Sequence, residues 1–171
     1  MFNIKGRQPV PSLEVSTVGG GKWSLATATP RTFTLIVFYR GLHCPVCKRY
    51  LGELEAMLPE LDEAGVTTVA ISADTAERAA QSKAEWGLDK LTVGYGLPTP
   101  KAREWGLFIS HAIRDGEAPE FNEPGLFLVK PDGTLFACCV GNASWTRPPL
   151  ASVLNGLKFA IERGNPARGE V

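Results

Sequence analysis

The sequence lacks any block of charge of one sign. Its 18 basic and 18 acidic residues cancel to a formal net charge of zero, and they are spread along the chain. A protein that binds a polyanion through charge carries a surplus of Lys and Arg, so we expect no nucleic-acid partner. A small or neutral substrate fits this balance better.

Long hydrophobic runs are also missing. No stretch approaches the roughly 20 apolar residues that a membrane helix needs. The first residues, MFNIKGRQPVPSL, lack the apolar core and the small-residue cleavage site of a signal peptide. We therefore expect no membrane association and a cytoplasmic location.

The chain has only two histidines and four cysteines. In a reducing cytoplasm four cysteines do not indicate a disulfide framework, so a close-spaced pair is first read as catalytic or metal-binding. A zinc site would need two ligands beyond that pair. The metal interpretation is weak because none of the candidate ligands lies in a second zinc knuckle: His43, His111 and the adjacent Cys138 and Cys139.

The length of 171 residues and the 44% of hydrophobic residues predict one domain, residues 1–171. Scattered Gly and Pro over 1–30 indicate an N-terminal lead-in with at most short extended pieces. The polar stretch at 107–124 is expected to be a long loop.

Hydrophobic patterns predict alternating strands and helices. Residues 32–40 and 66–74 are typical of buried strands, and 126–140 of a hairpin around KPDG. Helices are expected from Pro45 to about Gly65, over 75–87 and over 149–164; Pro59 should kink or split the first. This order predicts an α/β fold with a mixed central sheet and helices on both faces.

The segment GLHCPVCKRY (41–50) places two cysteines at the predicted junction of strand and helix. Pro45 suits the first helical position, which makes Cys44 the N-cap residue and puts Cys47 in the first turn. Free backbone N–H groups and the helix dipole there favour a thiolate, as would Arg40 if it turned toward the sulfurs. A thiolate attacks a peroxide or a disulfide, and the second cysteine can then close an intramolecular disulfide.

Other interpretations of these residues stay open. The pair could be structural or part of a metal site, and His43 could tune the thiols, orient a substrate or be a bystander. Cys138 and Cys139 are neighbours on a predicted strand, so they point to opposite faces, and at least one should be a buried core thiol. Aromatic residues in loops beside strands are expected at the edge of the core and are not assigned to the site: Trp105, Phe108, Phe121 and Trp145.

Three segments in order resemble the peroxiredoxin-like branch of the AhpC/TSA family, in the thioredoxin-fold superfamily. FYRGLHCPVC (38–47) is similar to the family's F-Y-P-x-x-x-T-P-x-C segment, VAISAD (69–74) to its second-strand signature, and LFLVKPDGTL (126–135) to its F-L-I-D-x-x-G hairpin. The resemblance covers residues 30–165 and implies a thioredoxin-like fold.

The resemblance implies two assignments of the cysteines. On the peroxiredoxin pattern Cys47 is the peroxidatic cysteine, and Arg40, Cys44 and Pro124 stand where the family has Pro, Thr and Arg. On the thioredoxin pattern Cys44 is the more exposed nucleophile, Cys47 resolves, and Pro124 takes the place of a cis-proline beside the disulfide. We favour Cys44 as the attacking cysteine.

The expected activity is that of an antioxidant thiol oxidoreductase that reduces hydroperoxides or protein disulfides through a Cys44–Cys47 cycle. Arg40, His43, Pro45 and Pro124 are the expected supporting residues. The alternative is a redox-sensing or partner-binding module without significant turnover. Such chemistry needs no bound cofactor or metal, but it needs an external thiol reductant such as thioredoxin or glutathione.

Overall fold

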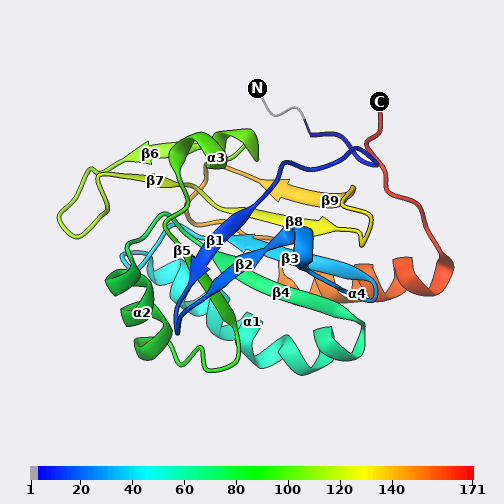
Figure 1. Ribbon diagram of the computed structural model, residues 1–171, viewed down its shortest axis with the longest axis horizontal. Helices are drawn as coiled ribbons and strands as arrows, with labels where there is room; N and C mark the ends of the chain where they lie inside the picture. Colours follow the sequence, from blue (N-terminus) through cyan, green and yellow to red (C-terminus); the bar gives the residue numbers. More distant parts are fainter. Residues whose placement is uncertain (1–3) are drawn as a thin grey trace.

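A seven-stranded mixed sheet forms the centre of the fold. It is seen in a computed structural model of the chain that describes residues 4–171. The strand order is β2 (Lys22–Ser24), β1 (Glu14–Thr17), β5 (Thr92–Tyr95), β4 (Val66–Ile71), β3 (Phe33–Phe38), β8 (Gly125–Val129) and β9 (Leu135–Val140). Each strand is labelled in Figure 1, where β1 and β2 lie in front of the others. The three strands β3, β4 and β5 are parallel, and antiparallel strands flank them on both sides.

Helices cover both faces of this sheet. On one face lie α1 (Pro45–Glu63), α2 (Ala76–Glu85) and α4 (Leu150–Arg163). On the other lies α3 (Thr99–Glu104), next to a ribbon of β6 (Ile109–His111) and β7 (Glu120–Asn122) (Figure 1). The predicted α/β fold with a mixed sheet and helices on both faces is confirmed.

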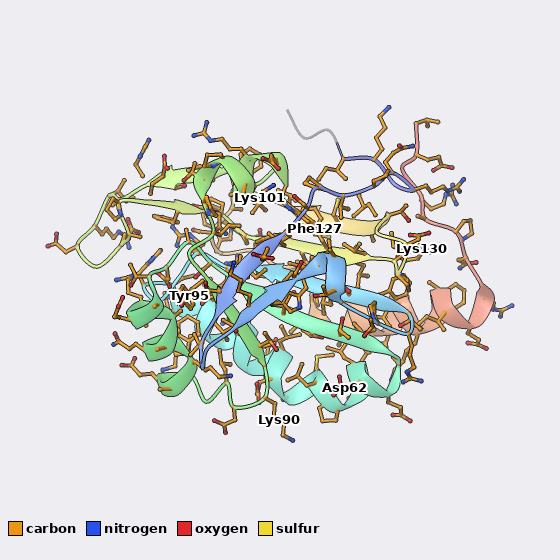
Figure 2. The ribbon with its side chains drawn as sticks, viewed as in Figure 1. Asp62, Lys90, Tyr95, Lys101, Phe127 and Lys130 are labelled. Carbon is orange, nitrogen blue, oxygen red and sulfur yellow. The ribbon has the colours of Figure 1, made fainter. Side chains whose placement is uncertain are left out.

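Strand β3 is buried along its whole length because both faces of the sheet are covered. Leu35 and Val37 point into the apolar cluster beneath α1, whereas Ile36 and Phe38 point into the cluster beneath α3. Figure 2 shows Phe127 of the neighbouring strand β8 over the middle of the sheet, in that second cluster. Continuous burial explains why the segment reads as an unbroken apolar run.

Helix α1 runs without a break from Pro45 to Glu63, although Pro59 lies inside it. The expected split does not occur, because six buried residues hold the helix against the sheet on both sides of Pro59: Cys47, Tyr50, Leu51, Leu54, Leu58 and Leu61. Packing of the apolar face outweighs the hydrogen bond that proline removes.

The two segments expected to be irregular contain short strands. In the lead-in, described from residue 4, β1 and β2 pair with each other, and a 3-10 helix η1 (Leu25–Thr27) follows. The segment 107–124 is not a loop throughout, because β6 and β7 pair from Ile109–Asn122 to His111–Glu120. The strands β1 and β2 agree with the short extended pieces expected in the lead-in. The strands β6 and β7 have three residues each, too few for a periodic pattern, and were not predicted.

Within residues 4–171 no helix combines the length and the apolar character that crossing a membrane would require.

Candidate active site

The two cysteines lie at the N-terminus of α1, directly beyond the end of β3. Cys44 is the N-cap residue, with φ −101° and ψ 104°, and its sulfur accepts a hydrogen bond from the Cys47 backbone N–H at 3.2 Å. Pro45 occupies the first turn, as the sequence predicts, and its side chain is exposed. The cap therefore uses a sulfur where most helices use an oxygen.

The loop that carries Cys44 is anchored by Asp74, which follows β4. The buried Asp74 carboxylate accepts a hydrogen bond from the Leu42 N–H at 2.8 Å, and Arg78 Nε lies 2.8 Å from its other oxygen. Gly41 has φ +127°, and a Cβ there would lie 2.8 Å from Asp74 Oδ1. Only glycine fits this close approach, so the glycine and the aspartate together set the position of the cysteine pair.

Both cysteines are buried. Each has 1% of its surface exposed, and both belong to the apolar cluster that includes Tyr39, Tyr50 and Leu126. The expectation that Cys44 is the more exposed thiol is therefore wrong. The reason is that the loop folds back over the cap, with the Cys44 N–H bonded to the Gly41 carbonyl at 3.1 Å.

Arg147 contacts the pair from the loop before α4. Its Nη2 donates a hydrogen bond to Cys47 Sγ at 3.2 Å, and its Nη1 donates to the carbonyls of Ser144 and Thr146 at 3.1 and 2.7 Å. The loop carbonyls thus hold the guanidinium in place. Sequence reasoning missed Arg147, because it is 100 residues from Cys47 and lies in an irregular segment. The resemblance suggested an arginine at residue 124 only.

Arg40 interacts with the pair through Cys44. Its Nε lies 3.0 Å from Glu123 Oε2, its Nη2 lies 4.0 Å from Glu117 Oε1, and its guanidinium carbon lies 4.9 Å from the centre of the Phe121 ring. Two carboxylates and an aromatic ring therefore orient the Arg40 guanidinium beside Cys44.

The two sulfurs differ in acidity. The pKa of Cys44 is lowered to about 6, first by a hydrogen bond from the Cys47 thiol, then by the Cys47 backbone N–H, Arg40 and Arg147, which together outweigh burial. The pKa of Cys47 is raised well above its ordinary value by burial and by the neighbouring Cys44. Cys44 is thus the thiolate near neutral pH, and Cys47 is the thiol that stabilises it.

His43 is neutral near neutral pH. Burial lowers its pKa below the ordinary value, and the charge of Arg40 lowers it further. Its ring packs against Phe121 with centroids 4.7 Å apart, and within residues 4–171 its buried nitrogens have no hydrogen-bond partner. His43 therefore packs as an uncharged aromatic ring beside Arg40.

A pocket of about 460 Å³ opens on the side of Arg147. Tyr50, Pro124, Leu126 and Arg147 contribute to its wall, and the Tyr50 hydroxyl donates to the Pro148 carbonyl at 2.7 Å.

The peptide bond before Pro124 is trans. The expectation of a cis bond there is wrong, because every peptide bond within residues 4–171 is trans. The chain passes from β7 to β8 through two residues, and the lower-energy trans isomer makes that connection.

Cys138 and Cys139 lie on strand β9, at the edge of the sheet. Cys138 is half-buried and Cys139 is exposed, so neither is the fully buried thiol that the sequence predicts. Only Cys138 packs against an apolar cluster, the one beneath α3, and it is partly covered there. Across residues 4–171 no three His, Cys, Asp or Glu side chains are grouped so that they could hold a metal ion.

Comparisons with known proteins identify the family and the fold. Residues 7–137 match the AhpC/TSA family, whereas no curated protein sequence matches the chain significantly. Among solved structures, peroxidoxin BcpB from Mycobacterium tuberculosis is 16% identical and superposes with a TM-score of 0.73 over 92% of this chain and 98% of its own. AhpC of Enterococcus faecalis is 18% identical, with a TM-score of 0.75 over 97% and 99% of the two chains. A peroxiredoxin-like protein from Aquifex aeolicus is 16% identical, with a TM-score of 0.76 over 92% and 88%.

Proposed function

Because the chain belongs to the AhpC/TSA family and has the thioredoxin-like fold of peroxiredoxins, we propose that it is a thiol-dependent peroxidase. It reduces hydroperoxides, with protein disulfides as the alternative oxidant, through a Cys44–Cys47 dithiol and disulfide cycle. The observation that carries the proposal is the paired cysteines at the N-terminus of α1, where the pKa of Cys44 is lowered to about 6.

The cycle starts with the Cys44 thiolate. It attacks one oxygen of the hydroperoxide, the O–O bond breaks, and Cys44 becomes a sulfenic acid. The departing alkoxide or hydroxide takes up a proton from solvent and leaves as the alcohol or water. The Cys47 sulfur then attacks the Cys44 sulfur, water leaves, and the disulfide forms. An external thiol reductant restores both thiols.

The two guanidinium groups have separate tasks in this scheme. Arg40 lowers the pKa of Cys44 and stabilises the attacking thiolate. Arg147 donates to Cys47 Sγ and so stabilises the negative charge that this sulfur takes on when it resolves the sulfenic acid. Arg147 also lines the 460 Å³ pocket, and we propose that the hydroperoxide approaches the pair from that side.

A stopped-flow assay of the reduced protein tests this function. Hydrogen peroxide, an organic hydroperoxide and a model protein disulfide are compared, with Cys44→Ser and Cys47→Ser in parallel. We expect a hydroperoxide to react at least about 100-fold faster than it does with a free thiol, and Cys44→Ser to abolish the fast phase. Rates no higher than those of a free thiol for both peroxides would refute peroxidase function.

The burial of both sulfurs favours a second candidate, a redox-sensing module whose disulfide alters a partner-binding surface. It predicts slow oxidation by every substrate together with a partner or an oligomer that depends on the redox state. Both functions need reduced thiols at rest, which is consistent with a cytoplasmic location.

A further inference from the structure

A second, smaller pocket lies on the outer side of the loop that carries Arg147. Its volume is about 320 Å³, at the lower end of the range for small-molecule sites. One wall is a stripe on α1 at helical spacing, and the other is the loop. The lining includes Val46, Arg49, Tyr50, Glu53, Trp145 and Arg147.

This pocket adjoins the cysteine pair. Val46 is one of the two residues between Cys44 and Cys47, and Arg147, which donates to Cys47 Sγ at 3.2 Å, belongs to the pocket wall. The Arg147 side chain is therefore shared by the pocket wall and the cysteine pair.

The pocket carries unpaired charges of both signs. Arg49 and Glu53 are exposed and four residues apart on α1, a spacing at which an ion pair commonly closes. Yet in the described part of the chain neither of them has an ion-pair partner within 4.0 Å, although eight other ion pairs are present there. Trp145, with 74% of its surface exposed, adds an apolar wall.

These features fit a small zwitterionic ligand. Arg49 can bind a carboxylate and Glu53 an ammonium group, while Trp145 packs on the body of the molecule. A volume of about 320 Å³ has room for a small thiol and not for the surface of a protein reductant.

We propose that this pocket binds a low-molecular-weight peptide thiol with carboxylate and ammonium groups, the chemical class of glutathione, and that this thiol reduces the Cys44–Cys47 disulfide. The inference rests on the proposed function, because that function supplies the disulfide.

Two thiols are consumed in each reduction. The first thiolate attacks the Cys47 sulfur, the disulfide bond breaks, and Cys44 leaves as a thiolate, which its lowered pKa favours. A second thiolate attacks the ligand sulfur of the mixed disulfide and releases Cys47. The products are the protein dithiol and one small disulfide; the two protons of the small thiols balance those that the cysteines take up.

The test is the kinetics of reduction of the preformed disulfide. The disulfide is made in a Cys138→Ser, Cys139→Ser background, so that the exposed Cys139 cannot react. It is made with diamide, so that the measured rate does not depend on peroxidase activity. Glutathione is compared with cysteamine, a thiol that has an ammonium group but no carboxylate, at equal thiolate concentrations. We expect reduction by glutathione to saturate and reduction by cysteamine to stay linear with concentration.

Two matched charge reversals on α1 distinguish direct binding of the thiol in the pocket from a general electrostatic effect of the charge on the helix. Arg49→Glu should lower the second-order rate with glutathione about tenfold, while Lys48→Glu, the same charge change at an exposed residue outside the pocket wall, should change it less than about twofold. Linear kinetics with glutathione, equal effects of the two reversals, or reduction by thioredoxin alone would each overturn the proposal. Failure of the proposed function appears separately, as a lack of disulfide formation when the reduced protein is mixed with hydroperoxide.

Discussion

The hydrogen bond that the Cys47 thiol donates to Cys44 is the largest cause of the lowered pKa of Cys44. Replacement of Cys47 by Ala removes that donor and leaves Arg40 and Arg147 in place. The pKa of Cys44 should therefore rise toward its ordinary value of 9.0 in Cys47→Ala, as measured by the ultraviolet absorbance of the thiolate against pH.

Serine provides the matched control, because its hydroxyl also donates. Cys47→Ser should keep most of the lowered pKa of Cys44, and equal titrations of the Ser and Ala variants would contradict this account.

The rate of oxidation should follow the same titration. Since only the thiolate attacks, the rate with a hydroperoxide should rise with pH around a midpoint of about 6 and level off above about pH 7. A midpoint near the ordinary thiol value would show that Cys44 is not activated in solution.

Arg147 can be tested through its bond to Cys47. Arg147→Ala should slow the formation of the disulfide from the sulfenic acid about tenfold or more, because the charge on Cys47 then lacks its hydrogen-bond donor. Disulfide formation is followed by stopped-flow fluorescence. The control Lys48→Ala removes an exposed basic residue of α1 next to Cys47 and should leave the rate unchanged.

At the scale of elements, the loop between β3 and α1 depends on one glycine. Gly41→Ala places a methyl group against Asp74 and forces a φ of +127° on a residue with a side chain. We expect a loss of about 2–4 kcal/mol in the free energy of unfolding, measured by urea denaturation. Gly52→Ala is the control, because Gly52 lies within α1 and a Cβ there meets no atom within 4 Å. The free energy of unfolding of this variant should be unchanged or higher.

The same elements show what the sequence could predict. The cap at Cys44 and the buried strand β3 follow from local signals, namely a proline at the first helical position and an unbroken apolar run. Arg147 and the pairing of β6 with β7 depend on contacts between distant or very short segments, and no local pattern marks those. The prediction that Cys44 is more exposed than Cys47 was wrong, because the exposure of Cys44 depends on how the loop folds back over the helix cap.

At the scale of the whole molecule, the cysteine pair links stability to pH. The pKa of Cys44 is about 6 in the folded protein and about 9.0 when unfolded, so the folded state favours the thiolate. The thiolate's contribution to the free energy of unfolding is complete above pH 9.0, the pKa of Cys44 in the unfolded chain. This stabilisation shrinks as the pH falls and is absent below about pH 6. The reduced protein should therefore gain on the order of 1–2 kcal/mol relative to Cys44→Ser between about pH 5.5 and 7.5.

Urea unfolding of both proteins at those two pH values measures the gain. A difference in unfolding free energy that is the same at both pH values would contradict the link between folding and the thiolate.

The central claim is that Cys44, not Cys47, attacks the oxidant, and chemical trapping of the sulfenic acid tests it most directly. Each single Cys→Ser variant at positions 44 and 47, in the Cys138→Ser, Cys139→Ser background, is treated with one equivalent of hydroperoxide in the presence of dimedone and examined by peptide mass spectrometry. The account predicts a dimedone adduct on Cys44 in Cys47→Ser and little or none on Cys47 in Cys44→Ser. Rapid labelling of Cys47 in Cys44→Ser, with Cys44 unlabelled in the other variant, would contradict it and make Cys47 the attacking cysteine.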